Sequence, residues 1–186
     1  VRLTGRLTGR EAVNGYVLPS SPLGAASALL EPHCPVSLRD VQNEAVKKWE
    51  ESGCCGILEM ATGTGKTYTA LAAAAARYST LGKLGLVVLV PYLHLLEQWA
   101  RDCRKFGFLP ILCSSQHPGW KIKARSAVSD MRWGTPHVCL LVVHNTAASH
   151  AFGDLAASLL SDCFMLVADE VHALGEEYND ADIAKE

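Results

Sequence analysis

One glycine-rich segment constrains this chain more than any other feature: Met60-Ala61-Thr62-Gly63-Thr64-Gly65-Lys66-Thr67. The apolar stretch 54–60 that leads into it has the length of a strand, and the alanine-rich stretch 66–78 that follows is typical of a helix. A loop between a strand and a helix N-terminus can wrap its backbone N–H groups around phosphates. In this setting Lys66 would reach the β- and γ-phosphates, and the Thr67 hydroxyl would bind Mg²⁺. The segment predicts a nucleoside-triphosphate site.

The match to the phosphate-loop pattern G-x-x-x-x-G-K-[ST] is incomplete, because Met60 stands where the pattern has its first glycine. The remaining positions fit, and the loop is flanked by the expected strand and helix. We therefore expect the nucleotide to contact a continuous run of residues: Ala61, Thr62, Gly63, Thr64, Gly65, Lys66 and Thr67.

An acidic pair, Asp169-Glu170, follows the apolar run 164–168 and lies 103 residues after Lys66. Carboxylates at the end of a buried strand cost free energy unless a cation balances their charge. With Mg²⁺ as that cation, Asp169 would hold the ion and Glu170 would orient and deprotonate the attacking water. We thus predict Lys66, Asp169 and Glu170 as catalytic residues, and Thr67 and Asp169 as the metal ligands.

The fold class follows from the alternation of short apolar runs with helical stretches. We expect strands at 54–60, 86–90, 109–113, 138–143 and 163–168, and helices at 37–52, 66–78, 93–105, 121–131 and 147–160. The first helix would begin at Ser37 as its N-cap and bury Val41, Ala45, Val46 and Trp49. This pattern predicts an α/β fold with a mainly parallel sheet and helices on both faces, whose ligands bind at the carboxyl ends of the strands.

Residues 1–36 have a different texture, rich in Pro, Ser, Gly and Ala, and the chain starts at Val1 without an initiator Met. We interpret 1–36 as a linker or the end of an upstream domain, and 37–186 as the folded domain.

The segment 101–132 contains seven basic and two acidic residues, a net charge of +5 in a chain of net charge −2. This basic block could meet a polyanion or could simply be solvated helix faces.

Composition excludes several classes of protein. With 49% hydrophobic residues the chain can bury a core. No apolar run reaches the length of a membrane span and no secretory signal is visible, so we expect a cytoplasmic protein, or a nuclear one in a eukaryote. The seven cysteines form no CxxC pair, which favours buried reduced thiols over disulfides or a zinc site.

The segments 60–67 and Asp-Glu-Val-His at 169–172 resemble motifs I and II of superfamily 2 helicases. The likeness is greater to the branch of restriction-enzyme motor subunits and excision-repair helicases, DEAH-like proteins in which Met commonly replaces the first glycine. DEAD-box RNA helicases would have Asp at 172. The resemblance implies a RecA-like P-loop NTPase domain that uses ATP and Mg²⁺, in which His172 links the nucleotide site to a second motor domain.

Three further segments resemble motifs of the same family. Around Arg39 and Gln42 the likeness is to the Q-motif, which implies that Gln42 pairs with adenine and Arg39 lies near the base. The stretch 88–99 resembles motif Ia, which implies that Pro91 and Gln98 contact nucleic acid. Thr146 stands where the family often has a phosphate contact. Gln42 could instead be solvated, Thr146 could cap a helix, and Trp99 is expected in the core whatever else it does.

The resemblance implies that this chain is the first RecA-like domain of a nucleic-acid-dependent ATPase, a helicase or translocase, with DNA favoured over RNA. The family's second RecA-like domain, which supplies an arginine finger, and further domains of the parent protein would be partners. This chain alone should therefore hydrolyse ATP very slowly. The alternatives are a nucleotide kinase, an RNA helicase domain, and a silent nucleotide-binding or protein-interaction module. The pathway, whether restriction, repair or antiphage defence, stays open.

Overall fold

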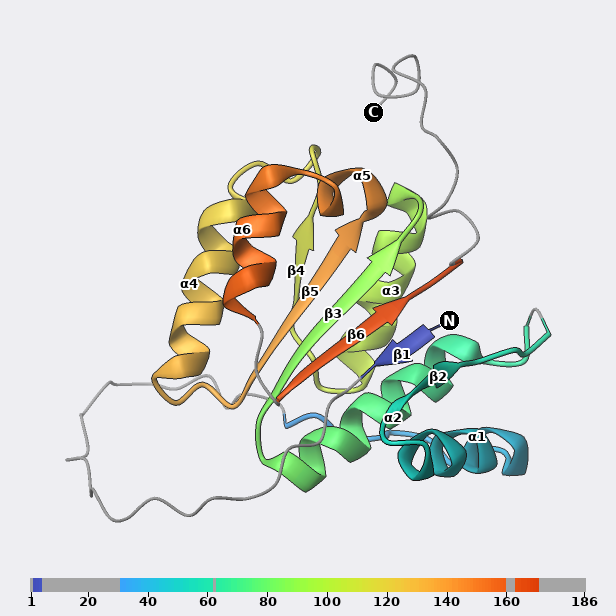
Figure 1. Cartoon of the computed structure of the whole chain (residues 1–186). Helices are drawn as coiled ribbons and strands as arrows, with labels where there is room; N and C mark the ends of the chain where they lie inside the picture. Colours follow the sequence, from blue (N-terminus) through green and yellow to red (C-terminus); the bar gives the residue numbers. More distant parts are fainter. Residues whose placement is uncertain (1, 5–30, 62, 160–162, 171–186) are drawn as a thin grey trace, which may run out of the picture.

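The computed structural model describes residues 2–4, 31–61, 63–159 and 163–170, which form one six-stranded sheet in the order β2-β1-β6-β3-β5-β4 (Figure 1). The strands are β1 (Arg2–Thr4), β2 (Cys55–Ile57), β3 (Leu84–Val90), β4 (Pro110–Cys113), β5 (His137–Val143) and β6 (Phe164–Ala168). Strands β6, β3, β5 and β4 run parallel, and β1 is antiparallel to both of its neighbours. The predicted α/β class with a mainly parallel sheet is confirmed.

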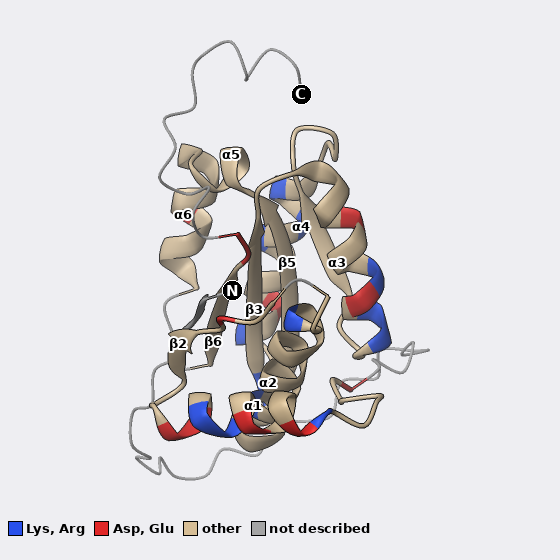
Figure 2. Ribbon diagram, turned by 90° about the vertical axis from the view of Figure 1, so that its right-hand side faces the viewer, with Lys and Arg blue, Asp and Glu red and all other residues tan. Residues whose placement is uncertain are grey.

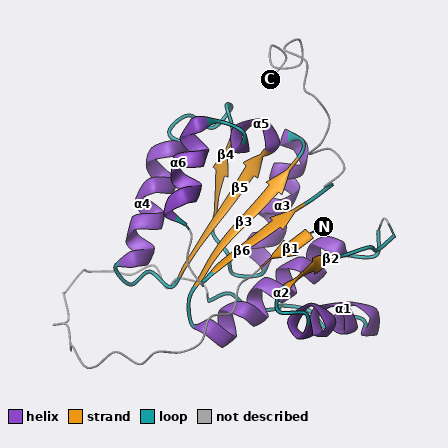
Figure 3. Cartoon of the chain, viewed as in Figure 1, coloured by secondary structure: helices purple, strands orange, loops and turns teal. Residues whose placement is uncertain are grey.

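Helices cover both faces of the sheet, as Figure 3 shows. They are α1 (Asp40–Glu51), α2 (Lys66–Leu81), α3 (Leu93–Lys105), α4 (Trp120–Arg132), α5 (His144–Ala147) and α6 (His150–Ser158). Buried side chains of α2 and α3 share one apolar cluster, and those of α4 and α6 share another. Along β3, Leu86 and Val88 belong to the first cluster and Val87 to the second. Because β3 has a helix layer on both sides, its sequence is apolar at consecutive positions.

The beginning of the sheet differs from the sequence interpretation. Residues 2–4, which we had assigned to a connector, lie between β2 and β6 as strand β1. The predicted strand at 54–60 is only the short strand β2, which ends the order of the described sheet, and its last residue, Ile57, is exposed.

Helix α1 begins at Asp40 with Arg39 as its N-cap, so the prediction that Ser37 caps it is wrong. The Arg39 backbone N–H donates to the Gln42 side chain, and this bond fixes the first turn. Val41 is 55% exposed, whereas Gln42 is 6% exposed. The buried stripe of α1 therefore contains a polar residue in place of an expected apolar one.

The helix predicted at 147–160 is α6, which begins at His150, and a separate short helix, α5, precedes it. Ser149 separates them: its hydroxyl donates to the Thr146 carbonyl and accepts the Phe152 N–H, so Ser149 caps α6. The alternative that Thr146 is this cap is wrong.

The seven cysteines are all free, and the buried ones are Cys54, Cys103, Cys113 and Cys139. Burial raises the pKa of the Cys113 thiol to about 12, which leaves it unreactive. Cys34 and Cys55 are exposed, so the expectation of buried thiols fails at these two positions.

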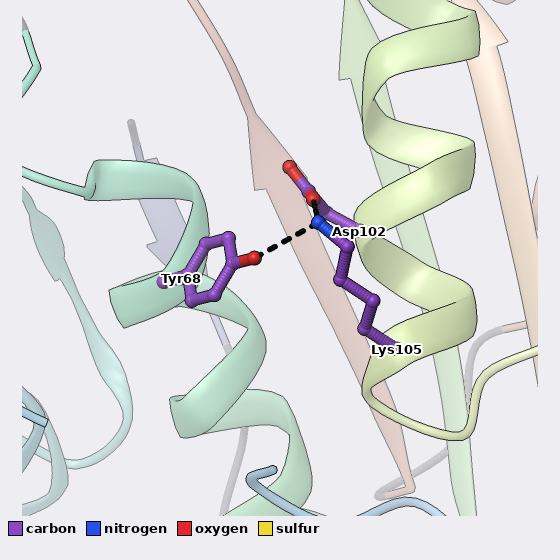
Figure 4. A network of polar contacts seen from close by, with 3 residues as sticks. All are labelled: Tyr68, Asp102 and Lys105. Atoms are coloured by element: carbon purple, nitrogen blue, oxygen red, sulfur yellow. Dashed lines mark hydrogen bonds and ion pairs between the residues drawn. The ribbon is translucent and has the colours of Figure 1, made fainter. Parts of the chain in front are cut away.

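The basic block 101–132 does not form a single surface. Its first part lies on α3 and its last part on α4, and the sheet separates these helices. On α3 the basic residues also alternate with acidic ones (Figure 2). Lys105 is bound by the Asp102 carboxylate at 2.7 Å and the Tyr68 hydroxyl at 3.0 Å (Figure 4), contacts that raise the pKa of Lys105, the Asp102 bond most. We therefore discard the idea of a continuous polyanion track over 101–132.

Candidate nucleotide site and nucleic-acid edge

Four strands deliver the predicted site residues to one edge of the sheet. Ile57 of β2 and Ala168 of β6 both lie opposite Arg2 of β1, so the ends of β2 and β6 are level and two strand spacings apart, about 10 Å. Val90 of β3 pairs with Val143 of β5, next to the end of β6. The phosphate loop, Pro91, Thr146 and Asp169 therefore all follow strand ends at the same edge.

The phosphate loop has the backbone that its glycines permit. Gly63 has φ +79° and Gly65 has φ +91°, both in the region that favours glycine, and Gly65 is the N-cap of α2. A Cβ at Gly63 would meet open space, whereas a Cβ at Gly65 would lie 2.5 Å from the Gln42 amide nitrogen. At Gly65 the loop thus leaves no room for a side chain against Gln42 of α1. Thr62 lies outside the described residues.

Lys66 folds back onto its own loop. Its ammonium donates to the Met60 carbonyl at 2.9 Å, and the Thr64 hydroxyl donates to the Ala61 carbonyl. The loop thus closes on itself at two points. A bound phosphate would compete with the Met60 carbonyl for the Lys66 ammonium. Thr67, the first-turn hydroxyl proposed to bind metal, is half-buried.

The N-terminus of α1 is fastened to this loop. The Arg39 guanidinium donates to the Thr64 carbonyl, and the Gln42 amide donates to the Gly65 carbonyl at 3.3 Å. Gln42 is therefore buried against the phosphate loop, which excludes the alternative that it is a solvated helix residue. The structure brings Arg39 and Gln42 to the nucleotide site; their contact with adenine stays a prediction.

Asp169 is half-buried at the end of β6, and its carboxylate has contacts at both oxygens. The Trp99 indole N–H donates to Oδ2 at 2.9 Å, and the Glu170 backbone N–H donates to Oδ1 at 3.1 Å. The Asp169 backbone N–H donates to the Leu89 carbonyl, which continues the sheet by one bond. Glu170 is exposed with φ +48°, a conformation that non-glycine residues rarely adopt and that often marks functional positions. His172 lies outside the described residues.

Sequence reasoning missed one residue at this edge, His144, which follows β5 and is 4% exposed. Neither ring nitrogen has a hydrogen-bond partner among the residues that the structure describes. Burial lowers the pKa of His144, and the negative charge of Asp169 acts in the opposite direction. A histidine that ends an apolar strand at the ligand-binding edge was the available signal.

The predicted nucleic-acid residues lie on two elements. Pro91 is buried directly after β3, while Gln98 is exposed on α3. Thr146 lines a cavity of about 650 Å³ at the ends of β4 and β5, together with the hydroxyls of Ser114 and Ser115 and with Lys121. Hydroxyls and a cation are groups that contact nucleic-acid backbones.

The residues at the edge suit a magnesium nucleotide. Thr67 and Asp169 offer only hydroxyl and carboxylate oxygens, the ligands that Mg²⁺ prefers. Gly63 leaves open space beside the loop where a larger residue would project. The donor set and the open loop both fit the cofactor that the sequence predicts.

Comparison with protein families gives a match to type III restriction enzyme, res subunit, over residues 35–185. The chain belongs to this family. The match spans the phosphate loop, the Asp169 strand end and the segments around Gln42 and Pro91, so it covers every predicted site residue of the edge described above, and also His172, which lies outside the described residues. A comparison with curated proteins found no match.

Membership makes this chain a helicase-like ATP-binding motor domain of the superfamily 2 type, as the motifs predicted. Proteins of this kind generally use ATP with Mg²⁺ and bind nucleic acid. No helix in the described part of the chain is both long and apolar enough to cross a membrane.

Proposed function

We propose that residues 37–186 are the first RecA-like domain of a DNA-dependent ATPase, a helicase or translocase. The observation that carries the proposal is the level register of β2 and β6, which sets the phosphate loop and Asp169 at one edge. Pro91 and Thr146 follow neighbouring strands at that edge, so nucleotide and DNA would bind next to each other. ATP hydrolysis would then change how tightly this domain binds DNA.

Within this site, Lys66 would bind the β- and γ-phosphates, and Thr67 and Asp169 would hold Mg²⁺. When bound, Mg²⁺ would neutralise charge on the phosphates. Glu170, on its strained exposed turn, would orient the attacking water and take its proton. Arg39 and Gln42 would read the base, since they already contact the loop that holds the phosphates.

On the nucleic-acid side, Pro91, Gln98 and Thr146 would contact the backbone. The cavity beside Thr146 supports this role because the Ser115 and Thr146 hydroxyls and Lys121 can bind phosphate. The Ser114 hydroxyl is instead buried and hydrogen-bonded to His117. DNA is favoured over RNA by the resemblance to restriction-enzyme motors. An RNA helicase is the second candidate, and it differs in which polymer stimulates hydrolysis.

The site also needs a partner. A superfamily 2 motor binds ATP between two RecA-like domains, and the second donates an arginine finger that contributes a factor of about 10³–10⁵ in rate. We propose that such a domain faces the carboxyl edge and that His172 connects it to the nucleotide site.

Nucleotide titration of this chain tests the proposal against a silent protein-interaction module. We expect ATP to bind more tightly with Mg²⁺ than with EDTA and Lys66→Ala to abolish that binding. Lys83→Ala, a matched loss of charge just before the amino end of β3, should have no effect. Binding that is absent, or that ignores both Mg²⁺ and Lys66, would favour the silent module.

A further inference from the structure

Trp99 is the largest side chain of the molecule that is almost fully buried, at 1% exposed, and its indole carries one hydrogen-bond donor. That N–H donates to Asp169 Oδ2 at 2.9 Å. Trp99 lies in the middle of α3 and Asp169 at the end of β6, so the bond joins two elements 70 residues apart in sequence. Among the described residues, it is the one hydrogen bond to the Asp169 carboxylate that comes from outside the end of β6.

Packing alone does not require this N–H. A phenylalanine would supply an aromatic ring to the same apolar cluster of α2, α3 and the sheet. What the indole adds is a neutral donor to a carboxylate, and hydrogen bonds to ionised acceptors are stronger than those between neutral groups. Donors to metal-binding side chains fix their orientation, and their loss typically weakens metal binding about 10–100-fold.

We propose that Trp99 is a positioning residue that holds the Asp169 carboxylate in the orientation in which it binds the nucleotide's metal ion. This inference rests on the proposed function, which gives Asp169 its metal. Without Trp99, the hydrogen bond that remains on the carboxylate among the described residues is that from the Glu170 N–H, which belongs to the adjacent residue and moves with it. The side chain could then rotate, and each metal ion bound would have to restrict that rotation.

The same bond ties the metal site to α3. Gln98, an exposed candidate for DNA contact, directly precedes Trp99. At the C-terminal end of α3, Lys105 donates a hydrogen bond to the Tyr68 hydroxyl of α2 (Figure 4). Helix α2 directly follows the phosphate loop.

The test uses the full 186-residue chain with ADP and Mn²⁺ as a spectroscopic substitute for Mg²⁺. Free Mn²⁺ is measured by electron paramagnetic resonance for the unmodified chain, Trp99→Phe and a matched control, Trp49→Phe, which changes another buried tryptophan of the same cluster on α1. We expect Trp99→Phe to weaken Mn²⁺ binding about tenfold or more. Its ADP affinity in EDTA should be unchanged, as should both affinities of Trp49→Phe.

A second measurement needs no change at Trp99. The four tryptophans give four indole N–H signals in a proton–nitrogen correlation spectrum. Addition of Mg²⁺ to the ADP-bound chain should shift the Trp99 signal and leave that of Trp49 in place, and Asp169→Asn should abolish the shift. A chain that binds Mg²⁺–ADP with no shift at Trp99, or a folded Trp99→Phe with Mn²⁺ affinity within twofold of the unmodified chain, would overturn the inference. Failure of the unmodified chain to bind any metal nucleotide would instead reject the proposed function.

Discussion

Gly65 offers a quantitative test of how α1 and the phosphate loop fit together. Alanine at this position has two costs. The first is backbone conformation, since φ is +91°, and a left-handed conformation costs an L-residue about 1–2 kcal/mol. The second is contact, because the new Cβ would lie 2.5 Å from the Gln42 amide nitrogen.

The contact cost can be worked from the hydrogen bonds. The Gln42 amide is the end of a flexible side chain and can move away from the new Cβ. The free-energy cost of the contact is then the loss of two hydrogen bonds, to the Gly65 carbonyl and from the Arg39 N–H. At about 0.5–1.5 kcal/mol each, these add about 1–3 kcal/mol. We expect Gly65→Ala to lower the free energy of unfolding by about 2–5 kcal/mol.

Gly63 is the matched control. Its φ of +79° gives Gly63→Ala the same conformational cost, but its Cβ meets nothing within 4 Å. Gly63→Ala should therefore cost only about 1–2 kcal/mol. The assay is urea unfolding without nucleotide, followed by circular dichroism, with equal m-values as the check that the same transition is compared.

A double-mutant cycle separates the two costs. In a Gln42→Ala background the closest contact has no partner and the Arg39 guanidinium, 3.2 Å from the new Cβ, is the tight neighbour that remains. Gly65→Ala should then cost little more than Gly63→Ala. Equal destabilisation by Gly63→Ala and Gly65→Ala in the unmodified background would show that the contact with Gln42 adds no cost at Gly65. Strict additivity of the free-energy changes of Gly65→Ala and Gln42→Ala would show the same.

Two further predictions concern pH and DNA. Burial lowers the pKa of His137 below its ordinary value of 6.5, so the unfolded chain takes up the proton first as the pH falls. Above about pH 6.5 the neutral ring contributes its full stability, and this contribution is lost as the pH falls toward the lowered pKa of His137. The urea midpoint should therefore decline between about pH 7 and 5. The decline should be less steep in His137→Phe, in which His144 keeps part of the slope. For DNA, Lys121→Ala should lower the magnitude of the slope of log binding constant against log salt concentration by about one unit, because Lys121 lines the Thr146 cavity. Arg104→Ala should leave this slope unchanged, because Arg104 lies at the far end of α3. Equal slopes for both variants would reject the cavity as a phosphate site.

The nucleotide site was predictable from sequence because its signals are local. The phosphate loop needs glycines, Lys66 and Thr67 in one short segment between a strand and a helix. Asp169 was predicted because an acidic residue at the end of an apolar run is energetically unusual. These patterns also predict the strand ends at which ligands would bind.

Features that depend on tertiary contacts were not predictable. The bond from Trp99 to Asp169 joins distant residues and leaves no local pattern. Gln42 is buried because the phosphate loop supplies its hydrogen-bond partner, a fact that helix periodicity does not contain. Strand β1 has only three residues, and its position follows from two neighbours that are distant in sequence. The basic block looked continuous because sequence does not reveal that the sheet divides it.

We propose that this edge of the sheet drives a DNA-dependent motor. The most direct measurement is ATP hydrolysis by the full-length protein alone, with DNA and with RNA, beside Glu170→Gln and the control Glu51→Gln at the exposed end of α1. We predict stimulation by DNA that Glu170→Gln abolishes and Glu51→Gln retains. Hydrolysis that neither polymer stimulates, or DNA-stimulated hydrolysis that survives in Glu170→Gln, would contradict the account.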